Sequence, residues 1–283
     1  MNSRNTINII LFVFVTILVA IVFFDSEEST QTTFNLTTLS ETEITSIEIT
    51  RQTDEALKFK KNNDLWYMIS PYKIRANTFY IESLLRITQA KSLSKFTISD
   101  TDKNKFKLNP AQASLKLNDQ LFLFGTNEQL NLNRYILTNK KLYLILDRYF
   151  YLLNSTTTGF IDHALIGKNE KITGLKLVDY DLQLINDKWK IKPDSENIGT
   201  DDIIQLITEW NNSQAVEITK LTDLNNIKKN FSIELTLKNN AQTIVFDIIV
   251  SDDSYLFIRR DLKLQYKLNQ EMANRLLKIP LND

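Results

Sequence analysis

The sequence predicts an α+β protein: an N-terminal transmembrane helix, then two tandem repeats, each an antiparallel sheet with one main helix and a short closing helix. Three observations predict this class: an apolar segment near the N-terminus, alternating apolar and polar residues typical of strands, and one ordered set of motifs that recurs. The 283-residue chain is 43% hydrophobic and 24% charged, a composition typical of a folded protein that buries a core.

The apolar segment 7–24 reads INIILFVFVTILVAIVFF. As a helix it would cover roughly 27 Å, close to the thickness of the hydrocarbon layer of a membrane. Arg4 precedes the segment and Asp25 follows it, an asymmetry that predicts residues 1–6 in the cytoplasm and the remainder outside. The alternative is a cleaved signal peptide, but residues 22–25 lack the small side chains of a cleavage site, which favours an uncleaved anchor.

Composition predicts the compartment and excludes several classes of site. The chain has no cysteine, which excludes disulfides, thiolate nucleophiles, cysteine-ligated zinc and a lipidated cysteine. A cysteine-free exported body is typical of a bacterial envelope, so the predicted location is the bacterial inner membrane with the bulk in the periplasm. Basic and acidic residues are equal at 34 each, which leaves no net charge to attract nucleic acid.

The body of the chain contains two copies of one motif set, about 120 positions apart. Each copy starts with an alternating strand pattern and continues to a tryptophan and a proline. The matched pairs are Ile44 with Ile172, Trp66 with Trp189, and Pro71 with Pro193. This agreement predicts a polar tether over residues 25–43, repeat one over 44–168 and repeat two over 169–283.

Each repeat is expected to carry a main helix after its proline. Asn77 or Thr78 in the first repeat and Thr200 in the second are the expected N-caps, because their side-chain oxygens can accept from the first free amides. Apolar residues then follow the i, i+3, i+4, i+7 spacing of one helix face. The face positions are Ile81, Leu84, Leu85, Thr88 and, in the second repeat, Ile203, Leu206, Ile207, Trp210. Short closing helices are predicted near 148–154 and 270–277.

Four strands are predicted between the main and closing helices of each repeat. They cover 114–117, 121–124, 134–138 and 142–146, and then 231–237, 243–250, 255–259 and 264–268. Alternation within them indicates sheets with one buried and one wet face. Asn118-Asp119 and Asn239-Asn240 are expected in tight hairpin turns, because both residue types tolerate positive φ.

Short motifs of the first repeat follow one another in a distinctive order. They are Ile47 and Ile49, then Trp66, Ile69 and Pro71, then LNPA at 108–111, Phe124-Gly125, Arg134-Tyr135-Ile136, and FIDHALI at 160–166. In this order the first repeat resembles the uncharacterised bacterial domain-of-unknown-function family 4340. The second repeat departs from the pattern, since no L-x-P element precedes Phe231. The resemblance implies an envelope-facing protein, in some relatives beside an ABC-type transport system of the gliding-auxiliary kind, with no known activity or functional residues.

The sequence predicts no catalytic, cofactor-binding or metal-binding residues. His163 is the only histidine, and the pair Asp162-His163 has no recognisable nucleophile or third ligand, so a structural role is favoured over a proton relay or metal pair. Two acidic groups, Asp247 with Asp252-Asp253 and Asp100 with Asp102, are interpreted as solvated turns because the order of a calcium loop is missing.

Basic and aromatic residues also receive structural interpretations. Arg259-Arg260 follows an aromatic strand and Lys60-Lys61 ends an early strand, so both could contact a polyanion. The neutral chain and its predicted address favour edge-strand residues that maintain solubility. Trp66 and Trp189 occupy matched positions, which favours core packing over stacking on a ligand.

These features predict a membrane-tethered extracytoplasmic interaction or scaffold protein, such as an accessory subunit of an envelope transport complex, and no enzyme. The alternative is a carrier that holds a lipid or another hydrophobic ligand between its sheets. A carboxylate hydrolase ranks last, because adjacent Asp252 and Asp253 on a strand point to opposite faces. The expected partners are the inner membrane, through residues 7–24, and other envelope proteins, with no nucleic acid and no cofactor.

Overall fold

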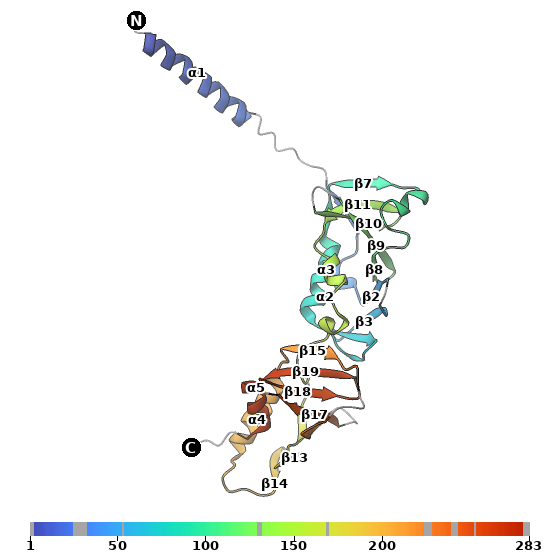
Figure 1. Ribbon diagram of the computed structural model, residues 1–283, viewed down its shortest axis with the longest axis vertical. Helices are drawn as coiled ribbons and strands as arrows, with labels where there is room; N and C mark the ends of the chain where they lie inside the picture. Colours follow the sequence, from blue (N-terminus) through green and yellow to red (C-terminus); the bar gives the residue numbers. More distant parts are fainter. Residues whose placement is uncertain are drawn as a thin grey trace.

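The structure is a computed structural model that describes residues 3–24, 33–52, 54–128, 132–167, 170–223, 228–238, 243–251 and 253–279. This part of the chain forms three sheets and five α-helices and is mostly β, with 42% strand (Figure 1). The predicted α+β class is therefore wrong. The physical reason is that the helices packed on the sheets are short, from 4 residues in α3 to 13 in α4, so strands supply most of the regular structure.

The predicted N-terminal transmembrane helix is the second part of the fold prediction that the structure contradicts. Helix α1 covers Ser3–Phe24, with side chains described over residues 6–20. Among the described residues, no helix has both the length and the apolar character needed to pass through a membrane. Residues 25–32 of the predicted tether, with Asp25, lie outside the described part.

The first large sheet has nine described strands, all paired antiparallel, in the order β5-β4-β3-β2-β8-β9-β10-β11-β7. Its strands are β2 Ser46–Arg51, β3 Leu57–Asn62, β4 Leu65–Ser70, β5 Ile74–Arg75, β7 Ser94–Thr97, β8 Ala113–Leu117, β9 Gln120–Asn127, β10 Asn133–Thr138 and β11 Lys141–Leu146. A small separate sheet pairs β1 (Phe34–Asn35) with β6 (Lys91–Ser92).

The second large sheet has eight described strands in the order β14-β13-β12-β16-β17-β18-β19-β15. Its strands are β12 Ile172–Lys176, β13 Asp181–Ile185, β14 Lys188–Lys192, β15 Glu217–Lys220, β16 Phe231–Leu237, β17 Ile244–Val250, β18 Ser254–Arg259 and β19 Leu264–Asn269. The two orders correspond strand for strand, from β4 and β14 to β7 and β15, and β5 is an addition to the first sheet. In each sheet one strand from the segment after the main helix, β7 in the first and β15 in the second, pairs with the strand that comes last in the chain, β11 or β19.

Hairpin turns in both sheets begin with an asparagine at positive φ, followed by aspartate or lysine. Asn63-Asp64, Asn139-Lys140 and Asn186-Asp187 each place both turn residues at φ between 47° and 63°. This is the backbone of a two-residue turn whose twist matches that of its strands. The turn predicted at Asn118-Asp119 joins β8 to β9, with Asn118 at φ 50°. Asn239-Asn240 lies outside the described residues.

Helices cover one face of each large sheet. In Figure 1, α2 (Thr78–Leu85) and α3 (Phe150–Leu153) lie on one side of the first sheet, and α4 (Thr200–Asn212) and α5 (Gln270–Leu277) on one side of the second. Asn77 is the N-cap of α2, as predicted. Helix α4 begins at Thr200, but its N-cap is Gly199, whose N–H donates to the Asp202 carboxylate at 2.8 Å.

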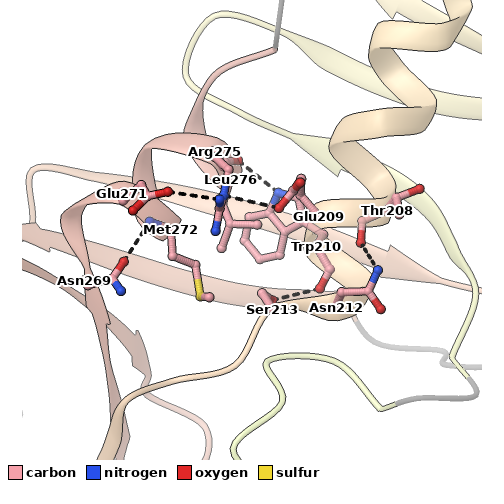
Figure 2. A network of polar contacts seen from close by, with 10 residues as sticks. All are labelled: Thr208, Glu209, Trp210, Asn212, Ser213, Asn269, Glu271, Met272, Arg275 and Leu276. Atoms are coloured by element: carbon pink, nitrogen blue, oxygen red, sulfur yellow. Dashed lines mark hydrogen bonds and ion pairs between the residues drawn. The ribbon is translucent and has the colours of Figure 1, made fainter.

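Helices α4 and α5 are joined by a buried indole and an exposed arginine (Figure 2). Trp210 is fully buried, and its Nε1–H donates to the carbonyl oxygen of Leu276 at 3.0 Å. Arg275 lies 3.4 Å from the carboxylate of Glu209 in α4 and 3.2 Å from that of Glu271 in α5. The indole bond therefore sets the depth at which α5 packs against α4.

Candidate functional site

The segment that links the two large sheets holds the predicted Asp162-His163 pair. It runs beside the linker after α4, where the N–H of Ala215 donates to the carbonyl oxygen of His163 at 2.8 Å. His163 Nδ1 lies 2.9 Å from the carbonyl oxygen of Ala215, and the Asp162 carboxylate lies 3.1 Å from Arg75 Nε. Both side chains thus hold the seam between the two sheets.

Asp100 and Asp102 lie at the 3₁₀ turn η3 (Thr101–Asn104), where each binds a nearby lysine. Lys103 Nζ is 2.8 Å from the Asp100 carboxylate, and Lys105 Nζ is 2.7 Å from that of Asp102. The hydrogen bond from Lys105 and then that from the Ser99 hydroxyl lower the pKa of Asp102 to about 2. These are local contacts of an exposed turn.

The interpretation of Asp247, with Asp252-Asp253, as part of a solvated turn is wrong for Asp247. It lies within β17 and its side chain is buried, and the hydroxyl of Ser232, the opposite residue of β16, donates to its carboxylate at 2.6 Å. Lys229 Nζ adds a contact at 3.1 Å, and Arg260 forms a short ion pair with it. Asp253 is exposed, and Asp252 lies outside the described residues.

The basic candidates are dispersed. The guanidinium of Arg259 binds both carboxylate oxygens of Asp261, at 2.9 and 2.6 Å, and Lys61 lies 3.3 Å from Asp64. Lys60 is exposed on the outer face of β3. The matched tryptophans differ in depth, since Trp66 is buried and Trp189 is half-buried.

A concave surface of about 810 Å³ lies beside α2 and α3, and we call it the basic groove. Its lining residues come from α2, η2 (Arg86–Gln89), β6, the end of β11 and α3: Phe79, Ser83, Arg86, Gln89, Ala90, Lys91, Ile145, Leu146, Asp147, Arg148, Tyr149, Tyr151 and Leu152. Phe79, Ser83 and Arg86 share one face of the helix because they are spaced i, i+4, i+7. The groove thus combines three cations with three aromatic rings.

Tyr149 connects the two chain segments that carry the arginines of the basic groove. Its hydroxyl donates to the carbonyl oxygen of Arg86 at 3.2 Å, which ties the loop before α3 to η2. Burial raises the pKa of the Tyr149 phenol, and the positive charges of Arg148 and Arg86 act in the opposite direction. The side chains of Arg86, Lys91 and Arg148 are themselves exposed.

Asp147 is the one acidic residue among those that line the basic groove, and it is already paired. Arg134 Nε, buried in β10, donates to its carboxylate at 2.9 Å. Arg134 also donates to Gln112 at 2.7 Å, and its guanidinium carbon lies 3.5 Å from the ring centroid of Phe150. The negative charge of Asp147 therefore offsets Arg134, and the three exposed cations leave the groove positive.

A second concave surface of about 440 Å³ adjoins the first, and we call it the seam groove. It is lined by Arg75, Asn77, Thr78, Phe79, Asp162, His163, Ala164, Asn211, Asn212, Ser213 and Gln214. Phe79, with 65% of its surface exposed, lines both grooves. The two grooves therefore meet at one aromatic side chain.

Sequence reasoning missed both grooves. Arg86, Lys91 and Arg148 are separated along the chain and form no motif, so only folding brings them together. The signal that could have found one edge is the run Arg148 to Tyr151, where a cation precedes three aromatic residues.

Between the two sheets the described residues leave a cavity of about 230 Å³, which is below the usual size of a small-molecule pocket, and its lining includes the apolar side chains Leu65, Ile74, Leu237 and Ile244. The inner faces of the sheets are otherwise filled by their own side chains. The largest of these core side chains, each at most 2% exposed, are Phe59, Phe122, Phe124, Phe160, Trp210, Phe246, Phe257 and Tyr266.

No family model, curated protein or solved structure matches this chain.

Proposed function

We propose that the protein is a membrane-tethered extracytoplasmic interaction protein that holds a partner of the cell envelope. The basic groove carries this proposal, because exposed arginine, tyrosine and phenylalanine are the side chains that dominate binding energy at protein interfaces. An accessory role in an ABC-type transport complex rests on the resemblance to family 4340 alone.

The proposals of a membrane tether and of an extracytoplasmic compartment rest on the charges around residues 7–24. Most described side chains of this segment are apolar and exposed, for example Phe12 at 74% and Ile10 at 64%. A C-terminal alkaline phosphatase fusion tests the compartment, since that enzyme is active only after export. We expect an active fusion that sediments with membranes, and an inactive fusion in the cytosol would contradict this address.

Site-specific photocrosslinking in cells tests the interaction. A benzophenone amino acid at Tyr151, exposed at the basic groove, is expected to give one discrete adduct with an envelope protein after irradiation. The matched control carries the same group at Lys188, an exposed position of β14 on the second sheet. Adducts of equal yield at both positions, or none at Tyr151, would contradict binding at this groove.

A further inference from the structure

We infer that the basic groove and the seam groove form one continuous site for an extended, acidic segment of a partner protein. This inference rests on the proposed function and names the chemistry of the partner. It places carboxylates of the segment over Arg86 and Arg148, an apolar side chain against Phe79, and the uncharged remainder of the segment along the seam groove.

The charge of the basic groove favours carboxylates. Among the described residues, Arg86, Lys91 and Arg148 take part in no ion pair within the chain. The acidic residue beside them, Asp147, is bound by Arg134. A guanidinium donates two parallel hydrogen bonds to a carboxylate, so two exposed arginines that line one groove suit acidic residues spaced along a segment.

The exposed rings favour a peptide as the source of these carboxylates. Phe79 and Tyr151 are 65% and 64% exposed and line the same groove as the arginines, where they can cover apolar side chains between the acidic ones. A groove of about 810 Å³ is within the usual size of a binding pocket, which encloses a short segment more readily than it fits a flat membrane surface.

The seam groove extends the site with neutral, amide-bearing side chains. Asn211, Asn212 and Gln214 present both donors and acceptors, which suit the N–H and C=O groups of an extended backbone. Asn212 Nδ2 donates to the carbonyl oxygen of Thr208 at 3.0 Å, which orients its amide. The charged residues here, Arg75 and Asp162, neutralise each other at 3.1 Å, so this end favours uncharged residues.

The test measures binding of defined peptides to the full chain in detergent by fluorescence anisotropy. The probe is a fluorescein-labelled peptide. One half of it alternates glutamate and leucine, and the other half is uncharged and consists of serine and glycine. We expect the double variant Arg86→Glu with Arg148→Glu to bind it at least about tenfold more weakly than the native chain. The matched control, Lys188→Glu with Lys190→Glu, makes the same change of charge on β14 and is expected to bind the probe as the native chain does.

Two further comparisons test the extent of the site. The double variant Asn211→Ala with Gln214→Ala is expected to bind the full probe several-fold more weakly than the native chain. It is expected to bind a peptide of the acidic half alone with unchanged affinity. A probe with lysine in place of glutamate is expected not to bind. Equal loss in the groove and control variants, or equal binding of the lysine probe, would overturn the inference.

The remaining outcomes separate this inference from the proposed function. Binding of phosphatidylglycerol vesicles or of a sulfated oligosaccharide through Arg86 and Arg148, without binding of the peptide, would overturn the inference in favour of a lipid or glycan ligand. If the crosslink from Tyr151 persists in the double arginine variant, the acidic-segment site is wrong while the interaction role stands.

Discussion

Arg134 Nε lies 2.9 Å from the Asp147 carboxylate, and this ion pair of a buried arginine with a half-buried carboxylate fastens the rim of the basic groove to the interior of the first sheet. Arg134 also donates to the carbonyl oxygen of Gly125 in β9. One guanidinium thus connects β9, β10 and the loop that leads into α3. The next residue, Arg148, is exposed to solvent.

Replacing Arg134 by leucine is expected to lower the free energy of unfolding by about 3 kcal/mol. The change leaves the Asp147 carboxylate and the Gly125 carbonyl without their buried donor, which costs more than the pair itself contributes. Urea unfolding followed by circular dichroism measures the effect. The control is Arg148→Leu on the exposed rim, expected within about 0.5 kcal/mol of the native chain. Equal midpoints for the two variants would show that the ion pair is dispensable.

Gly125→Ala is expected to destabilise the first sheet by about 3 kcal/mol or more, because overpacking forces the backbone to move. A Cβ at this position would lie 2.2 Å from the carbonyl oxygen of Phe106, which is backbone and cannot rotate away. The control is Gly167→Ala, whose Cβ would meet the flexible Glu170 side chain at 3.0 Å. Thermal unfolding of both variants distinguishes them, and an unchanged Tm for Gly125→Ala would contradict the close approach.

Trp210→Phe is expected to cost about 2 kcal/mol, since the Leu276 carbonyl loses its donor and the smaller ring leaves space in a filled core. Trp189→Phe, at the matched but half-buried position of β14, is expected to cost less than about 1 kcal/mol. Guanidinium unfolding of the two variants gives both values. A larger loss for Trp189→Phe than for Trp210→Phe would mean that the packing of α4 against α5 contributes less to stability than the hairpin of β13 and β14.

Asp247 is expected to make stability depend on pH in acid. Burial raises its pKa, but hydrogen bonds from Ser232, Arg260 and Lys229 outweigh burial and bring the pKa below the ordinary 3.8. Its contribution is therefore complete above about pH 3.8 and is lost as the pH falls through the lower, folded-state value. Asp247→Asn is expected to flatten this decline in unfolding free energy, measured between roughly pH 5 and pH 2.

Asp253→Asn is the control for that experiment, because Asp253 is exposed on the same segment. It is expected to leave the slope of stability against pH unchanged. If both variants flatten the decline equally, the effect comes from the net charge of the chain and the buried contacts of Asp247 are not its cause.

Local features of the fold were predictable because they depend on neighbouring residues. Strands β16 and β19 begin where alternation predicts, at Phe231 and Leu264, and α5 covers the predicted 270–277. Asn118 turns a hairpin because its side chain tolerates positive φ. The edge strands β7 and β15 and the two-stranded sheet were not predicted, since their pairing partners lie far along the chain. Three further hairpin turns, at Asn63-Asp64, Asn139-Lys140 and Asn186-Asp187, are local and were missed.

By itself, the sequence determined the approximate positions of the eight strands between the main and closing helices, the helix that starts after Asn77 and the recurrence of tryptophan and proline. Tertiary structure decided the mostly β class, the burial of Asp247 between strands, and the meeting of Arg86 with Arg148 at one groove. The physical reason is range: alternation and capping act within a few residues, whereas burial and charge clustering depend on which distant segments the sheet brings into contact.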